Sequence, residues 1–159
     1  MKYIKTGQKR SDAKRKINVI VDNKDYNFLN QFYWQVSMEN VVLTRFNKKT
    51  ILMSRFIIQA PDDLEVDHID GNRLNNQRSN LRLATSSQNK MNRGPRIDCK
   101  SGYKGVSWHK QNSKWTARIM ANGKYLSLGL FENILDAARS YNLAAKKYHK
   151  EFAWLNQIN

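Results

Sequence analysis

The stretch VDHIDGNRLNN at residues 66–76 sets a histidine between an aspartate and a tight turn. The imidazole of His68 suits proton transfer, because an unperturbed pKa of about 6.5 leaves it mostly neutral at pH 7. The carboxylate of Asp67 and the side-chain oxygen of Asn89 are ligands that one hard cation, Mg²⁺ or Mn²⁺, would take while keeping several waters. These residue types suit metal-assisted hydrolysis. A solvated histidine in a polar turn is the alternative.

The pattern around these residues predicts a short unit that would position them. Residues 66–69 are typical of the end of a strand, and residues 70–72 of a turn. Residues 80–83 predict a returning strand, and residues 85–89 carry the polar side chains that cap and open a helix. We therefore expect a strand, a loop, a second strand and a helix in close succession.

The net charge of the chain points to a polyanionic partner. The 159 residues hold 28 Lys and Arg against 13 Asp and Glu, a formal charge of +15 with a pI near 10.1. The excess is spread along the chain, since residues 1–100 carry +9 and residues 101–159 carry +6. Nucleic acid is the usual partner of such a field. A solvated basic surface, a ribosome-associated protein and a membrane-surface protein fit the charge equally well.

Hydropathy and cysteine content exclude several classes. The mean hydropathy of −0.74 and the lack of a long apolar run predict no membrane-spanning helix and no membrane partner. The basic N-terminus is followed by no apolar signal core, so we expect a cytoplasmic protein. The single cysteine, Cys99, excludes an internal disulfide framework and a thiolate zinc site. Any bound metal would be held by oxygen and imidazole.

The pattern along the chain predicts four segments. Residues 1–16 hold seven basic residues and little to bury, which predicts a mobile basic arm that either follows phosphates or has no role. Residues 17–93 begin with β-branched and aromatic runs, INVIV, FYWQV, NVVLTRF and TILMSRFII, separated by DNKD and NKKT. They predict strands followed by a short helix at 54–59. Residues 94–100 contain Gly94-Pro95 and predict a linker to residues 101–159.

Residues 101–159 predict a three-stranded sheet with one helix. The runs GYKGVSWHK, KWTARIM and KYLSLGLF are joined by the turns QNS and ANG. Residues 132–148 carry apolar residues at steps of three and four, which form one stripe along a helix. Because a bare sheet of this size is unstable, the stripe should cover one face. The fold class of the whole chain is therefore α+β.

Alternation along the strands assigns the opposite, open face of this sheet. Trp115, Ala117 and Ile119 should point toward the helix, and their neighbours away from it. The open face offers side chains that can contact phosphates and base edges in a major groove. An ordinary amphipathic sheet with one solvated face is the alternative. The candidate DNA-binding residues are Lys104, Ser107, His109, Lys114, Thr116, Arg118, Met120, Tyr125 and Ser127.

Residues 101–156 resemble the APETALA-two, or ethylene-response-factor-like, DNA-binding domain. The resemblance is carried by YKGVSW, KWTARI, SLGLF and DAARSYNLAAKKYHKEFAWLN. It implies a three-stranded antiparallel sheet, packed on one helix, that places its open face in the major groove. Several open-face positions that are usually Arg in the plant proteins are Ser107, His109, Met120 and Tyr125 here, so the family's sequence preference does not carry over.

Residues 43–92 resemble the HNH nucleases, and the first half as a whole resembles their homing-endonuclease members. The resemblance is carried by LEVDHIDGNRLNNQRSNLRLATSSQN, in which His68, Asn80 and Asn89 follow at gaps of twelve and nine residues. It implies a ββα-metal fold, with His68 as general base and Asp67 and Asn89 as ligands of one metal ion. Asn80, the second catalytic-site residue, would pin the loop so that His68 faces the phosphate.

Together these features predict a site-specific, divalent-metal-dependent DNA endonuclease of homing type. The first domain would cut double-stranded DNA and the second would anchor the chain at its site. One active unit per chain favours a monomer that nicks one strand, whereas a double-strand break would need two subunits or sequential cuts. A phage or mobile-element origin is implied by resemblance. The alternatives are a non-catalytic DNA-binding regulator with a degenerate nuclease fold and, less consistent with the motifs, an RNA-binding protein.

Overall fold

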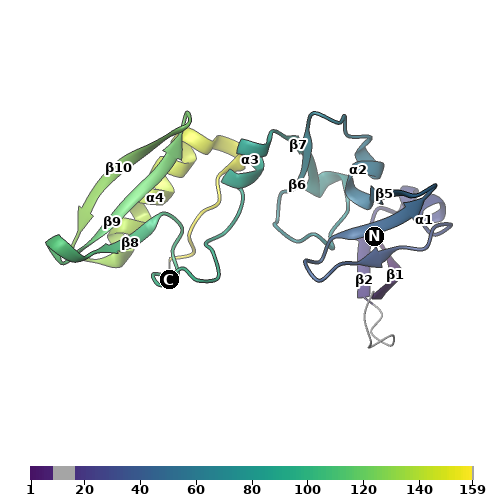
Figure 1. The fold of residues 1–159 in the computed structure, drawn as a ribbon, viewed down its shortest axis with the longest axis horizontal. Coiled ribbons are helices and arrows are strands. Elements are labelled where there is room, and N and C mark those ends of the chain that lie inside the picture. The colour runs from purple at the N-terminus through teal and green to yellow at the C-terminus, as the bar shows by residue number, and fades with distance from the viewer. Residues whose placement is uncertain (9–16, 159) are drawn as a thin grey trace. The chain divides into compact units, whose positions relative to one another are not determined.

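The computed structural model describes residues 1–8 and 17–158, and its fold is α+β as predicted (Figure 1). The chain divides into two compact units, residues 1–89 and residues 90–159. The division falls between Asn89 and Lys90, upstream of the linker expected at 94–100. Residues 94–100 therefore belong to the second unit, where the backbone of Gly94 lies against the ring of Trp154.

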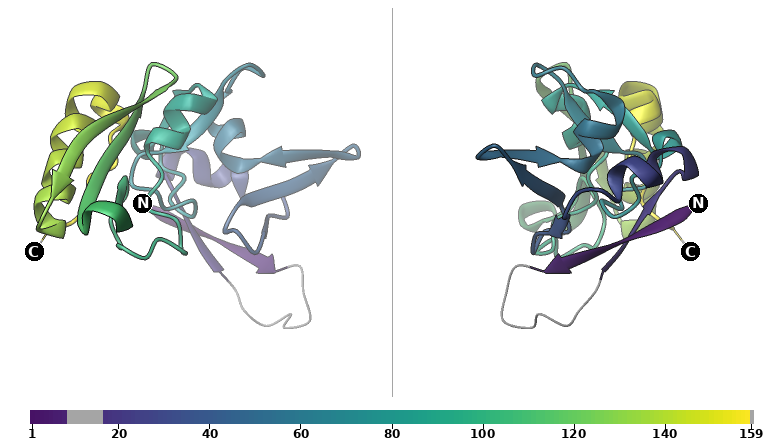
Figure 2. Two further views of the ribbon diagram at one scale, coloured as in Figure 1. Left: turned by 60° about the vertical axis from the view of Figure 1, so that its left-hand side comes forward. Right: turned by 90° about the vertical axis from the view of Figure 1, so that its right-hand side faces the viewer.

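The first unit is built on a five-stranded sheet with the strand order β2-β1-β3-β4-β5. All neighbouring strands are antiparallel except β1 and β3, which are parallel. The β4–β5 turn places Asn47 and Lys48 at positive φ, as the type I′ turn of a two-residue hairpin requires. Figure 2 shows this hairpin extending from the sheet. The strands are β1 (Lys2–Gln8), β2 (Ile17–Val21), β3 (Gln35–Val36), β4 (Val42–Phe46) and β5 (Lys49–Leu52).

The prediction of a mobile arm over residues 1–16 is wrong for its first half, because Lys2–Gln8 forms strand β1. Alternate side chains of this strand are buried: Ile4 is 2% exposed and Thr6 is 3% exposed. Burial of these two side chains and backbone pairing with β2 outweigh the repulsion among its lysines. The rest of the predicted arm, residues 9–16, lies outside the described residues.

Two short helices complete the core of the first unit. Helix α2 (Met53–Ile58) lies where a helix was predicted, and it buries Met53 and Ile57. Helix α1 (Asn23–Leu29) was not predicted, because Asn and Asp are poor helix formers in isolation. Packing stabilises it: Leu29 is buried, and its carbonyl accepts a hydrogen bond from the buried indole of Trp34 (2.8 Å).

The predicted strand, loop, strand and helix are confirmed. Strand β6 (Glu65–His68) pairs antiparallel with β7 (Leu81–Ala84), and a short 3₁₀ turn, η1 (Arg78–Asn80), precedes β7. Helix α3 (Ser86–Met91) follows directly. Thr85 and Gln88 hold the start of α3 by reciprocal bonds, each backbone N–H donating to the other's side-chain oxygen.

The second unit is a three-stranded antiparallel sheet with one long helix along one face (Figure 2). Helix α4 begins at Ile134, where the Asn133 side chain accepts a hydrogen bond from the N–H of Leu135 (2.7 Å). The predicted start and end of this helix were thus each within two residues. The elements are β8 (Val106–His109), η2 (Lys110–Asn112), β9 (Lys114–Ala121), β10 (Lys124–Phe131), α4 (Ile134–His149) and η3 (Lys150–Phe152).

Small side chains allow α4 to lie close to the sheet. Ala137, Ala138 and Ala145 are fully buried against Ala117 and Ile119 of the central strand β9 and their neighbours. The predicted inward face of β9 is therefore confirmed at these two positions. The close approach of helix and sheet leaves no space beside Gly105, where the ring of Tyr141 meets the backbone.

The C-terminal segment is fixed to the start of the sheet by Asn156. Its side chain accepts from the N–H of Lys104 (2.7 Å) and donates to the carbonyl of the same residue (3.1 Å). Its backbone exchanges two further bonds with the side chain of Asn142 on α4. One buried amide, that of Asn156, thus holds three segments together.

Substitution of Gly105 by alanine should strongly destabilise the second unit. An added Cβ would lie 2.2 Å from the Tyr141 ring and 2.5 Å from the carbonyl oxygen of Arg118, at a φ of +75°. Strain and overlap together should cost about 3 kcal/mol or more. Gly123→Ala is the matched control, because its φ is +74° with no atom within 4 Å, and it should cost about 1–2 kcal/mol. Urea denaturation of the full chain compares the two, and equal losses would contradict the packing argument.

Candidate active site

His68 is the last residue of β6, and its imidazole is held by Asn76. Nε2 of His68 lies 3.3 Å from Oδ1 of Asn76, a residue only 1% exposed. The Asn76 amide nitrogen donates to the carbonyl of Arg73 (3.0 Å), which fixes the oxygen of the amide toward the histidine. Nε2 must therefore carry the proton and donate it to Asn76. In the neutral ring, Nδ1 is then the basic nitrogen.

The surroundings of His68 favour its neutral form. Burial lowers the pKa of His68 below 6.5, and the nearby charge of Arg73 adds to this. The bond to Asn76 and the carboxylates of Asp70 and Asp67 oppose the shift without cancelling it. His68 is consequently neutral at pH 7 and able to accept a proton.

The loop after His68 is tied together by Asn80. Its side-chain oxygen accepts from the N–H of Asp70 (3.0 Å), and its amide donates to Oδ1 of Asp70 (2.9 Å) and to the carbonyl of Asn75 (2.8 Å). Partial burial tends to raise the pKa of Asp70, but hydrogen bonds from Asn75, Asn72 and Asn80 bring that pKa below its usual value. A charged carboxylate and a buried amide thus close the loop.

The same loop docks on the edge strand β2. The N–H of Ile20 donates to the carbonyl of Leu74 (2.9 Å), and the N–H of Asn76 donates to the carbonyl of Ile20 (2.8 Å). Just beyond the loop, the N–H of Arg78 donates to the Asp22 carboxylate (2.8 Å). The five-stranded sheet therefore sets the position of Asn76, and through Asn76 the orientation of His68.

Asp67 lies on the other face of β6 and is paired with an arginine. Strand alternation directs the Asp67 and His68 side chains to opposite faces. Asp67 is 4% exposed, and its Oδ2 accepts from Nε of Arg82 (2.8 Å) and lies 2.6 Å from Nη2 of the same residue. Arg82 is the residue directly opposite Asp67 in the β6–β7 register.

Asn89 is linked to β6 by Glu65, which its side-chain amide contacts through a hydrogen bond. Glu65 stands two residues before Asp67, so alternation puts both carboxylates on the face that Asn89 approaches. The structure thus brings the two predicted metal ligands to one face. In the described ranges 1–8 and 17–158, no three His, Cys, Asp or Glu residues form a metal cluster. The oxygen donors here nevertheless fit a hard cation that keeps most of its water.

The open face of the β8–β10 sheet carries the predicted DNA-binding residues, with one exception. Register and alternation place Ser107, His109, Lys114, Thr116, Arg118, Met120, Tyr125 and Ser127 on the face opposite α4. Thr116, at the centre, is buried by its neighbours on the adjacent strands. Lys114 forms an ion pair with Glu132 (2.9 Å).

Lys104 is the exception, because it lies before β8 and its ammonium group is occupied within its own unit. Nζ donates to the carbonyls of Met91 and Arg93 (2.6 Å each) and of Lys90 (3.3 Å), at the end of α3. Burial, with a smaller contribution from Arg93, lowers the pKa of Lys104 to about 8. Lys104 thus caps a helix within its own unit, and its contact with DNA stays a prediction.

Comparison with known proteins agrees with this division of the chain. Residues 59–91 match the HNH endonuclease family, and residues 101–151 match the AP2 domain. The chain combines an HNH endonuclease domain with an AP2 domain. The HNH match spans β6, the Asn80 loop, β7 and α3, which are the elements that hold His68, Asp67 and Asn89.

Relatives of each domain come from different sources. The chain is 40% identical over 101 residues to "Uncharacterized HNH endonuclease L560" of Acanthamoeba polyphaga mimivirus, covering 64% of this chain and 51% of that protein. It is 42% identical over 64 residues to "Protein 3.8" of Escherichia phage T7, covering 40% and 53%. It is 39% identical over 69 residues to "AP2-like ethylene-responsive transcription factor TOE2" of Arabidopsis thaliana, covering 43% and 14%.

The chain thus spans about half the length of the two viral relatives. No solved structure matches it. Within the described residues, none of the helices has the length and apolar character needed to cross a membrane.

Four residues of the HNH domain escaped the sequence reasoning: Asn76, Asp70, Arg82 and Glu65. Each contacts a predicted site residue. Glu65 and Arg82 had a detectable signal, because alternation and antiparallel register put them beside Asp67. Asn76 had none, since its contact with His68 depends on how the loop docks on β2.

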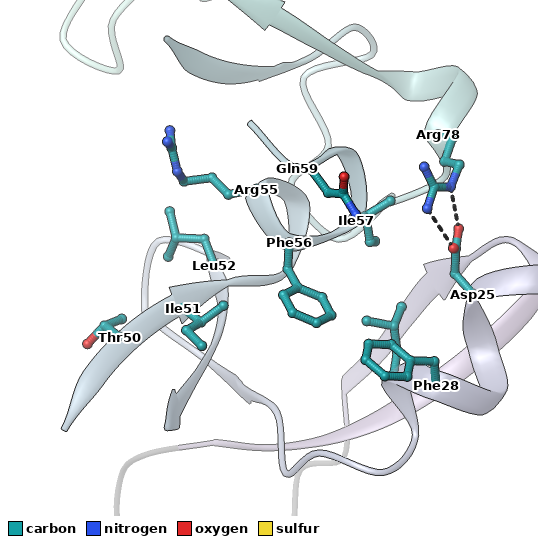
Figure 3. A pocket seen from close by; sticks show the side chains of 11 residues that line it. Asp25, Phe28, Thr50, Ile51, Leu52, Arg55, Phe56, Ile57, Gln59 and Arg78 are labelled. Carbon is teal, nitrogen blue, oxygen red and sulfur yellow. Dashed lines mark hydrogen bonds and ion pairs between the residues drawn. The ribbon is translucent and has the colours of Figure 1, made fainter. Parts of the chain in front are cut away.

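The first unit also has an open pocket that contains none of the predicted site residues (Figure 3). The stacked rings of Phe28 and Phe56 lie within it, with centroids 5.5 Å apart. The ion pair of Arg78 and Asp25 (2.9 Å) lies at its edge. The Arg55 guanidinium is engaged by the carbonyls of Leu64 and Pro61 (2.6 and 2.7 Å). The pocket is therefore separate from the candidate active site.

Replacement of Asn80 by alanine should loosen the loop that carries Asp70. The N–H of Asp70 and the carbonyl of Asn75 lose their partners, which should cost about 1–3 kcal/mol. Hydrogen exchange of the Asp70 amide in the full chain should accelerate in parallel. Asn72→Ala is the control, because its exposed side chain accepts a hydrogen bond from the N–H of Leu74 (3.1 Å) and, among residues 1–8 and 17–158, bonds no other group. If the Asp70 amide of the Asn80 variant exchanged at the native rate, as expected for the Asn72 control, Asn80 would not hold the loop.

Proposed function

We propose that this chain is a site-specific, divalent-metal-dependent DNA endonuclease of homing type. The observation that carries the proposal is the state of His68: it is held neutral, with a defined basic nitrogen, next in sequence to a carboxylate within an HNH endonuclease domain. Hydrolysis of a phosphodiester needs a base that deprotonates water at neutral pH. His68 fits this need without a large change in its environment.

Each site residue has a distinct role in the proposed reaction. Nδ1 of His68 accepts the proton of the attacking water, and Asn76 keeps Nε2 protonated throughout. Asp67 and Asn89 would hold one Mg²⁺ or Mn²⁺, which supplies charge neutralisation at the scissile phosphate and the departing 3′ oxygen. Asn80 is a positioning residue that fixes the loop around His68.

The AP2 domain would recognise the DNA sequence of the target site. Contacts from a small nuclease unit go mainly to the DNA backbone, which carries little sequence information. The open face of β8–β10 offers Arg118, whose side chain has no carboxylate partner among residues 1–8 and 17–158. An unpaired guanidinium can bond the O6 and N7 of guanine in the major groove. We propose that residues 17–93 cut double-stranded DNA and that residues 101–159 recognise its sequence.

The single candidate site within residues 1–8 and 17–158 supports a monomer that nicks one strand. The relatives from a mimivirus and from phage T7 support action within a host cell that carries viral or mobile DNA. A cytoplasmic location follows from the same proposal.

One observation favours a second candidate, a DNA-binding regulator without cleavage activity. Arg82 already neutralises Asp67 at 2.6 and 2.8 Å, where a metal ligand is needed. If the Asp67 carboxylate kept Arg82 in the presence of metal, it would link β6 to β7 and bind no cation. The two candidates differ in whether a divalent ion leads to cleavage.

Cleavage by the purified chain should require both a divalent ion and His68. In Mg²⁺ the chain should nick duplex DNA, and EDTA should stop the reaction. His68→Ala should abolish cleavage while leaving DNA affinity within about twofold, because the AP2 face is unchanged. Ile69→Ala, at the exposed neighbouring position, is the control and should retain activity. Nicking by the His68 variant would remove the histidine as base, and binding without cutting by the native chain would favour the regulator.

The pH dependence of nicking should follow the lowered pKa of His68. The rate at saturating metal should be flat from pH 7 to 8 and should fall only below the ordinary histidine value of about 6.5, by about tenfold per unit once below the actual pKa. The rate falls at low pH because protonation of His68 removes the base. A rate that still rose tenfold between pH 7 and 8 would mean that a different group accepts the proton.

Loss of Arg118 should weaken specific binding more than non-specific binding. Arg118→Ala should cost about 1–3 kcal/mol of discrimination at one base pair if the side chain contacts guanine. Arg139→Ala is the matched control, because this exposed arginine pairs with Asp136 on α4, which covers the opposite face. The measurement is a competition between the preferred duplex and random DNA in EDTA, and an unchanged ratio would assign Arg118 to phosphate contact.

A further inference from the structure

A β-bulge in β10 changes which side chains reach the open face of the AP2 domain. The register with β9 pairs Ser127 with Arg118 and then Gly129 with Ala117, so Leu128 is an extra residue on β10. Leu128 packs with the core under α4. Beyond the bulge, Leu130 pairs with Thr116 and therefore shares the open face with it.

The open face consequently has an apolar group at each end of its arginine. Met120 pairs with Tyr125 on one side of Arg118, and Leu130 pairs with Thr116 on the other. Met120 is 39% exposed, Leu130 is 44% exposed and Tyr125 is 73% exposed. No element of the second unit covers them, since α4 lies on the opposite face (Figure 2).

These apolar groups have a natural counterpart in the major groove. The only apolar group that a base pair presents there is the C5 methyl of thymine. A protein of formal charge +15 brings its surface to duplex DNA by contacts with phosphates. An uncharged Met or Leu gains nothing from phosphate, but it can bury a thymine methyl.

We propose that Met120 and Leu130 recognise thymine methyl groups on the two sides of the base pair contacted by Arg118. The inference rests on the proposed function, in which this face enters the major groove. Met120 lies two residues after Arg118 on β9, and Leu130 of β10 lies opposite Thr116, two residues before Arg118, so each is displaced from Arg118 along the strand direction by about 6.6–6.8 Å. Base pairs are spaced about 3.4 Å along the helix axis. For strands that follow the groove, the preferred site has a guanine with a thymine about two base pairs away on either side.

Replacement of thymine by deoxyuridine tests the proposal, because it removes only the methyl group. The preferred duplex is first selected from a randomised library with the full chain in EDTA. Each thymine is then replaced singly by deoxyuridine, and the Kd is measured. Loss of one buried methyl should weaken binding about three- to fivefold at two positions that flank the guanine.

Variants assign each methyl group to its side chain. Met120→Ala should abolish the response to deoxyuridine at one position only, and Leu130→Ala at the other only. Leu143→Ala is the matched control: this leucine is 70% exposed on α4 and should leave both responses intact. Because both test side chains are partly exposed, the variants should fold, and the measurements on the native chain stand without them.

The outcomes separate this inference from the proposed function. Tight, sequence-selective binding with no response to deoxyuridine at any position would overturn the thymine inference alone. The same conclusion follows if both responses persisted in the Met120 and Leu130 variants. A chain that preferred no duplex over random DNA would overturn the proposed role of the AP2 face itself.

Discussion

The candidate active site depends on the hydrogen bonds that Asn80 makes across the β6–β7 loop. Its buried amide joins Asp70 and Asn75, and the closed loop then pairs with the edge strand β2. Without that docking Asn76 would have no fixed place, and His68 would have no fixed tautomer. A loop rich in Asn can be held this way because each amide both donates and accepts, so few residues satisfy many backbone groups.

The two domains meet the demands of their proposed tasks by different physical means. The HNH domain buries ionisable groups and pairs them, as with Asp67 and Arg82, so that its site is preorganised. The AP2 domain keeps its polar and apolar groups exposed on a rigid sheet, which small alanines allow α4 to support closely. Chemistry needs a shielded site, whereas recognition needs an accessible surface.

Much of both domains could be predicted because the signals are local. The polar loop after His68, the Asn-Gly turn at 122–123 and the apolar stripe of residues 132–148 each specify their element through nearby residues alone. The strand at Lys2–Gln8 and helix α1 were missed because partners outside these elements stabilise them. Asp25 of α1, for example, is fixed by Arg78, which lies 53 residues away in the sequence.

The sequence by itself determined the chemical inventory: a histidine beside carboxylate and amide oxygens, a strongly basic chain, and a sheet with one amphipathic helix. Only the tertiary structure decided which partners those groups acquire. Strand register or loop docking brings these groups together. It places Arg82 beside Asp67, Asn76 beside His68, and the ammonium group of Lys104 against backbone carbonyls near the end of α3. Leu130 shows the physical reason most directly: one extra residue in β10 reverses the alternation, and no count along the chain reveals where the opposing strand will accept it.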